Sequence, residues 1–207
     1  MEYTSLDGEL NIETKKMNKG YESLDEEFNI ETKKMYHKWF NKYIKDGKEA
    51  FENAVIAMGK TYNVLRTLPK QEENESQDDN KTDDSENELN ENIREKFFRD
   101  IWDNIKVIQT GEYKWSKTIE NRHFYSYLSK VCYLIKPEKY KIIYDTNNEK
   151  RLKELYPERT WNPNNWQKNI DEIFDDLVNK YQVELKKYKD GSPEYYFCLD
   201  FLLWKKN

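Results

Sequence analysis

Two ionisable residues in the C-terminal half of the chain, Lys130 and Asp145, have the types and settings that chemistry at an electrophilic carbon requires. Lys130 lies in an apolar segment predicted to be helical, and burial there would lower its pKa and make the amine nucleophilic. Asp145 opens the next predicted helix, whose dipole and free N–H groups favour a charged carboxylate. The pair therefore predicts attack by an amine, beside a fixed negative charge that stabilises developing positive charge.

The segment around these residues, 122–152, reads RHFYSYLSKVCYLIKPEKYKIIYDTNNEKRL. It resembles the core of the helix-hairpin-helix DNA glycosylase superfamily, in which a lysine starts an apolar helix and an essential aspartate follows a short loop. Lys130 matches that lysine, Asp145 the aspartate, Thr146 a following threonine and Arg151, loosely, an arginine. A divergent bacterial and phage group is closer still, because its late Leu-Asp-x-x-Leu-Trp pattern is matched by residues 199–204.

The resemblance implies an all-α fold and excision of a DNA base, with Lys130 and Asp145 as the catalytic residues. The target base would be flipped out of the duplex and stacked on an aromatic side chain. The candidates for that stacking are Tyr125, Tyr127, Trp115 and Trp161. The sequence departs from the family in having no glycine at 120–124, where a phosphate-gripping hairpin is expected, and in its shorter lysine–aspartate interval.

Basic residues gather in the same region, although the whole chain has a net charge of -5. Residues 114–153 hold ten Lys and Arg against four Asp and Glu, which is suited to binding a polyanion. The residues expected to contact DNA are Arg122, Lys136, Lys139, Lys141 and Arg151.

Each of these features also has a purely structural interpretation. Asp145 can be an N-cap alone, Lys130 a surface lysine, and the basic cluster a solvated face. In that case the chain would be a non-enzymatic interaction factor of phage or bacterial defence or counter-defence type. It would bind another protein through its acidic linker or N-terminal repeat, on a degenerate scaffold. Whether the chain is an enzyme therefore stays open at this point.

Composition limits the class of protein and the cellular compartment in which it is expected. The chain has 207 residues, a mean hydropathy of -1.16 and 15% aromatic residues, so a real core is expected despite its polarity. Cys132 and Cys198 lie in apolar patterns and are expected to be buried thiols in a reducing compartment. No stretch resembles a secretory signal or a membrane span, which favours the cytoplasm and no membrane partner. Without a Cys/His set or a glycine-rich phosphate loop, no metal or cofactor is expected.

Helical periodicity extends over most of the chain. Helices are predicted at 36–68, 92–109, 117–135, 145–155, 164–188 and from Pro193 onward, with Gly111 and Pro137 as breaks. The expected fold is therefore all-α, a bundle of about five helices at 93–207 plus an N-terminal helix in 36–70. Any sheet should be no more than a small hairpin near 139–144.

The remaining segments are a repeat and a charged linker. YTSLDGELNIETKKM at 3–17 recurs as YESLDEEFNIETKKM at 21–35, with twelve of fifteen positions identical, so that 1–35 forms a duplicated arm. Residues 71–92 hold ten acidic residues against Lys81, and like-charge repulsion predicts a flexible linker there.

Overall fold

A computed structural model describes residues 26–61, 84–119 and 122–205. Ten helices and one two-stranded sheet are assigned in these ranges, which confirms a mostly helical, essentially all-α protein. The N-terminal helices are α2 (Glu26–Asp46) and α3 (Lys48–Thr61), followed by α4 (Asp84–Asp103) and α5 (Ile105–Thr110). Next come α6 (Tyr125–Ile135), α7 (Pro137–Tyr140) and α8 (Thr146–Leu155), then α9 (Trp166–Lys180), α10 (Gln182–Leu185) and α11 (Pro193–Lys205).

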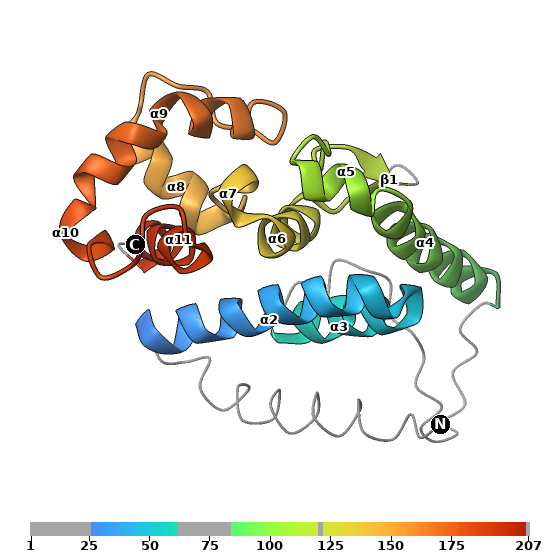
Figure 1. Ribbon diagram of the computed structural model, residues 1–207. Coiled ribbons are helices and arrows are strands. Elements are labelled where there is room, and N and C mark those ends of the chain that lie inside the picture. Colours follow the sequence, from blue (N-terminus) through green and yellow to red (C-terminus); the bar gives the residue numbers. More distant parts are fainter. Residues whose placement is uncertain (1–25, 62–83, 120–121, 206–207) are drawn as a thin grey trace, which may run out of the picture.

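Helices α2 and α3 lie side by side beneath the other helices, and α2 packs against both α6 and α11 (Figure 1). Large side chains from α2 that are fully buried, such as Tyr36 and Phe40, share one core with those of α6 and α11. Hydrogen bonds join the layers, because Tyr127 donates to the Val55 carbonyl at 2.7 Å and His37 Nδ1 lies 2.7 Å from the Leu134 carbonyl. The N-terminal helices are thus part of the core that holds α6 in place.

The helix predicted at 36–68 is divided and displaced in the structure. It begins earlier, at Glu26, inside the second copy of the repeat, and Gly47 separates α2 from α3. Gly47 has a φ of 119°, a conformation that favours glycine. The first copy of the repeat lies outside the described residues, as does the part of the acidic linker up to residue 83. The rest of that linker, from Asp84, is the start of α4 rather than an irregular segment.

The small sheet lies elsewhere than expected. Strands β1 (Thr118–Ile119) and β2 (Arg122–His123) pair antiparallel, within the stretch predicted to be the start of a helix. Residues 139–144, where a hairpin was expected, instead end α7 and continue as a loop. Lys141 in that loop has a φ of 46°, which is uncommon for a residue with a side chain.

Several helix ends follow the expected chemistry. Gly111 ends α5 in the left-handed conformation, and its N–H bonds to the Ile108 carbonyl at 3.0 Å. Ser192 precedes α11 and accepts from the Tyr195 N–H at 3.3 Å, with Pro193 as the first helical residue. Both cysteines are buried free thiols, as predicted.

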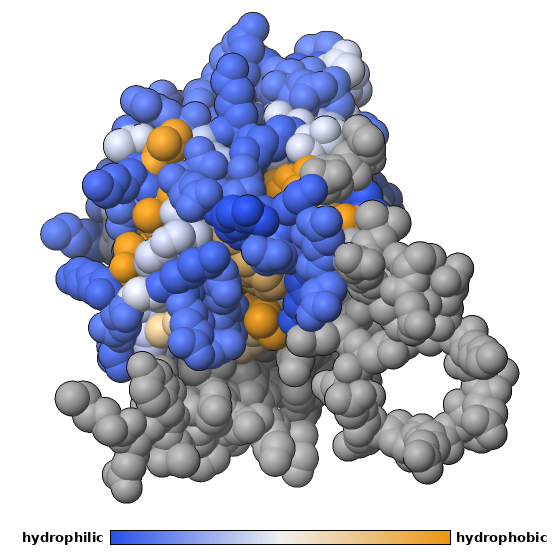
Figure 2. Space-filling view, turned by 90° about the vertical axis from the view of Figure 1, so that its right-hand side faces the viewer, coloured by the Kyte–Doolittle hydropathy of each residue, from blue (hydrophilic) through white to orange (hydrophobic). Residues whose placement is uncertain are grey.

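Among the described residues, the only large hydrophobic side chains that are exposed are Val107 and Val183. Figure 2 shows one face on which hydrophobic side chains form small, separate patches among polar ones. Among the described helices, none combines the length and the apolar character needed to cross a membrane.

Asp200 on α11 connects three parts of the fold. Its side chain is buried and accepts from Lys33 Nζ at 2.7 Å, from the Ile143 N–H at 2.9 Å and from Asn148 Nδ2 at 2.9 Å. Lys33 is also buried, so the two charges compensate each other away from water. Removal of one partner would leave the other charge buried and unpaired.

We therefore expect Asp200→Ala to lower the free energy of unfolding by about 3–5 kcal/mol. The measurement is urea denaturation followed by circular dichroism. Glu95→Ala is the matched control, because Glu95 pairs with Arg99 on the surface of α4 and its loss should cost about 0.5 kcal/mol or less. Equal losses in the two variants would contradict a central role for Asp200.

Candidate active site around Lys130 and Asp145

Lys130 and Asp145 meet at the junction of α6 and α8. Lys130 Nζ lies 3.7 Å from Asp145 Oδ2 and 3.0 Å from Ser126 Oγ. Lys130 is in the middle of α6, in which most of the buried residues are apolar, and its own side chain is only 8% exposed. The prediction that Lys130 loses solvation on an apolar helix is confirmed, and the interpretation of Lys130 as a surface lysine is wrong.

Asp145 is the N-cap of α8. Its Oδ1 accepts from the Asn148 N–H at 2.9 Å, as its position before Thr146 predicted. The other oxygen, Oδ2, faces Lys130, so that one carboxylate performs capping and ion pairing at once. The Asp145 side chain is 21% exposed, and it is therefore the more accessible member of the pair.

A short set of hydrogen bonds fixes the loop that delivers Asp145. Ser129 Oγ donates to the Tyr144 carbonyl and accepts from the Tyr144 N–H, both at 3.2 Å. On the other side, Asp200 binds Ile143 and Asn148, which flank Asp145. The backbone around Asp145 is thus held by both α6 and α11.

Burial controls the electrostatics of the pair. It lowers the pKa of Lys130, against the opposing effects of the Asp145 and Asp200 charges. It also raises the pKa of Asp145, although the Lys130 charge and the Asn148 N–H act in the other direction. The helix end favours the charged form of Asp145 as expected, but loss of solvation has the larger effect on its pKa.

Aromatic rings line the same junction. The Tyr144 ring lies 5.5 Å from Trp115, 6.4 Å from Tyr125 and 5.0 Å from Trp166, measured between ring centroids. Tyr125 is half-buried and also contacts His123 at 4.8 Å. Tyr125 thus remains suited to stacking, and Tyr144 and His123 are aromatic neighbours that the sequence analysis did not single out.

Three of the proposed stacking residues belong to the core instead, and one of them, Trp115, is 4% exposed. Tyr127 is fully buried and hydrogen-bonded to α3. Trp161 is 4% exposed, with its indole N–H directed to the Tyr156 carbonyl. None of these three rings is accessible to a flipped base.

The five basic residues predicted to bind DNA have different surroundings. Arg122 and Lys139 are exposed. The other three are ion-paired within the protein, Lys136 with Glu138, Lys141 with Asp171 and Arg151 with Glu154. Arg122 directly precedes His123, whose ring contacts Tyr125.

Among the charged and amide side chains around this site, sequence reasoning missed Lys33, Asn148 and Asp200. The available signal was a polar residue inside an apolar helix, as Asp200 is within the Leu-Asp-x-x-Leu-Trp pattern. Within the described residues, no group of three or more His, Cys, Asp and Glu side chains is arranged to hold a metal ion.

Comparison of the chain with protein-family models, with curated proteins and with solved structures gives no match.

The buried environment makes a measurable prediction for Lys130. Its amine should titrate below the ordinary lysine value of 10.5, because burial disfavours the charged form. NMR detection of the lysine Cε and Nζ signals over a pH series measures this directly, with Lys130→Met to assign the signal. Lys153, whose side chain is 56% exposed, is the control. Titration of Lys130 together with or above Lys153 would refute the prediction.

Proposed function

We propose that this protein acts on DNA and removes a base through Lys130 and Asp145. The observation that carries the proposal is the buried ion pair at the start of α8, in which an amine of lowered pKa lies 3.7 Å from a partly exposed carboxylate. Tyr144 and Tyr125 beside it supply ring faces for an extruded base. The resemblance of residues 122–152 and 199–204 to DNA glycosylases agrees with the same assignment.

In this proposal the neutral Lys130 amine attacks C1′ of the nucleotide. A C1′–N bond to Lys130 forms as the bond to the base breaks, and the base leaves with the electron pair and takes one proton from the amine. Opening of the sugar ring with uptake of a proton at O4′ then gives an iminium ion. The Asp145 carboxylate stabilises the positive charge that develops at the sugar.

Ser126 and Asp200 have positioning roles in this proposal. Ser126 Oγ accepts from Lys130 Nζ and orients the amine, while Asp200 holds the backbone on both sides of Asp145. Neither needs to touch the nucleotide.

Covalent trapping tests the chemistry. Borohydride should reduce the iminium ion and link the protein to DNA that carries an abasic site or a damaged base. Lys130→Gln should abolish the adduct. Asp145→Asn should slow its formation by about 10²–10³-fold and preserve the fold, because asparagine is also a good N-cap.

The matched control for trapping is Lys153→Gln, on the exposed side of α8, which should leave adduct formation unchanged. The rate of trapping should rise with pH and level off below the ordinary lysine pKa of 10.5, since the neutral amine is the reactive form. Base release without any adduct would mean that water, assisted by Asp145, is the nucleophile in place of Lys130. Absence of both reactions over a broad panel of lesions would refute base excision.

The second candidate function is non-enzymatic binding of another protein on a degenerate glycosylase-like scaffold. The observation in its favour is the burial of Lys130, which is 6% exposed when backbone and side chain are counted together. A buried amine is poorly accessible to a nucleotide. Under this alternative Lys130 and Asp145 only join α6 to α8, and the acidic linker or repeated arm makes the contacts.

DNA binding separates the two candidates. Six acidic residues lie at 71–83, before α4, and their replacement by Asn or Gln should tighten binding to a DNA duplex at low salt. These residues are Glu72, Glu73, Glu75, Asp78, Asp79 and Asp83. The full chain with the same segment in shuffled order is the control, because it keeps the charge. Fluorescence anisotropy over a salt series gives the comparison, and negligible binding by every variant would favour a protein partner.

A further inference from the structure

The first ten residues of α2 are a docked copy of the repeat. Within Glu26–Met35, the side chains of Ile30, Thr32 and Lys33 are buried, with 2%, 2% and 3% of their surfaces exposed. Lys33 is the central contact, since its Nζ donates to Asp200 Oδ2 at 2.7 Å and to the Phe197 carbonyl at 3.4 Å. This copy therefore docks on α11 through specific buried contacts.

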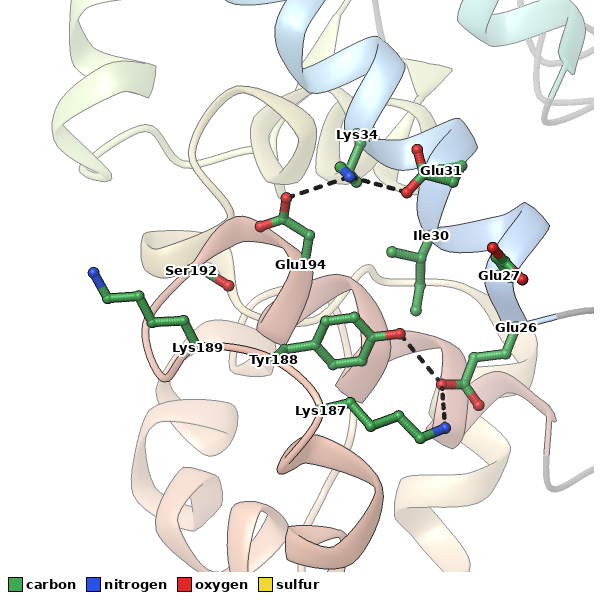
Figure 3. Close-up of a pocket in the computed structure, with 10 residues that line it drawn as sticks. All are labelled: Glu26, Glu27, Ile30, Glu31, Lys34, Lys187, Tyr188, Lys189, Ser192 and Glu194. Carbon is green, nitrogen blue, oxygen red and sulfur yellow. Dashed lines mark hydrogen bonds and ion pairs between the residues drawn. The ribbon is translucent and has the colours of Figure 1, made fainter.

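A second set of contacts surrounds the docked copy at an open groove of about 770 Å³ between α2 and the segment that leads into α11 (Figure 3). Glu26 pairs with Lys187 at 3.5 Å and accepts from the Tyr188 hydroxyl at 3.4 Å. Lys34 pairs with Glu194 at 3.7 Å. These contacts are partly exposed and contribute less than the buried Lys33–Asp200 pair.

The first copy of the repeat carries the same buried anchors. Residues 8–17 match residues 26–35 at eight of ten positions, and Ile12, Thr14 and Lys15 correspond to Ile30, Thr32 and Lys33. One of the two differences removes a groove contact, because Gly8 stands where Glu26 pairs with Lys187. The three anchors that are buried among the described side chains are thus present twice, whereas the Glu26 contact at the groove is present once.

We propose that residues 8–17 are an alternative occupant of the α11 surface and exchange with residues 26–35 of the same chain. In the exchanged form Lys15 pairs with Asp200, Ile12 fills the site of Ile30, and residues 18–35 leave the surface as a loop before Tyr36. The Glu26 contacts are lost in that form, so that the copy at 26–35 is the preferred occupant. In the exchanged form the copy at 26–35 is released from the α11 surface.

The first copy of the same chain is a stronger competitor for the α11 surface than a copy from a second chain, because its effective concentration is higher. In the exchanged form a loop of 18 residues, 18–35, joins the docked first copy to Tyr36, and a tether of that length gives a local concentration on the order of millimolar. A second copy of the chain at micromolar concentration competes poorly against that.

A set of four full-length chains tests the exchange: wild type, Lys15→Ala, Lys33→Ala and the double variant. Lys15→Ala alone should leave the urea midpoint unchanged, since Lys33 holds the site. Lys33→Ala should lower the midpoint modestly, because the first copy replaces the second. The double variant should lose at least twice as much as Lys33→Ala, because neither copy then offers a partner to Asp200.

The matched control is the double variant Lys16→Ala with Lys33→Ala. Lys16 corresponds to the groove residue Lys34, so this variant should lose no more stability than Lys33→Ala alone. If Lys33→Ala fails to fold, Lys33→Met, which keeps most of the side-chain stem, enters the same set of four. Equal losses with and without Lys15→Ala would overturn the proposal. A midpoint of Lys33→Ala that rises with protein concentration, with dimers in light scattering, would assign the occupant to a second chain and also overturn it.

Discussion

The buried carboxylate of Asp200 is the interaction on which the rest of the structure depends. A charge that is 3% exposed is tolerated only when it is paired and hydrogen-bonded, and Asp200 receives a cation from α2 and two N–H groups from the Ile143–Asn148 segment. The fold must therefore bring α2, α8 and α11 together at one point. This requirement explains why residues as distant in sequence as Lys33 and Asp200 share one site.

The position of Asp145 follows from that constraint. Asp200 accepts hydrogen bonds from Ile143 and Asn148, and Ser129 is hydrogen-bonded to the backbone of Tyr144. These bonds hold the loop after α7 so that Asp145, the N-cap of α8, faces α6. Lys130 and Asp145 are fifteen residues apart in sequence and 3.7 Å apart in space because of this loop. The same hydrogen bonds would serve a reactive pair or a purely structural one, which is why the proposed function depends on reactivity and not on geometry alone.

Local features could be predicted from the sequence, and features that depend on distant contacts could not. The N-caps at Asp145 and Ser192 and the end of α5 at Gly111 follow from neighbouring residues, and they were predicted. The strand pair at 118–119 and 122–123 and the start of α4 at Asp84 were missed, because a local charge or helical pattern does not fix where an element begins. The Lys130–Asp145 pair was predicted from its motif, whereas Lys33 has no local signal that distinguishes it from Lys34.

The aromatic side chains give the molecule an optical property of its own. From Trp115 through Tyr144 and Trp166 to Trp161, successive ring centroids are 5.5, 5.0 and 5.5 Å apart. At such separations tyrosine transfers its excitation to tryptophan, and coupled indoles give strong near-ultraviolet dichroism only while they are rigid. Because Tyr144 is adjacent to Asp145, the intrinsic emission and dichroism of this row of rings report on whatever enters the junction of α6 and α8, without an added label.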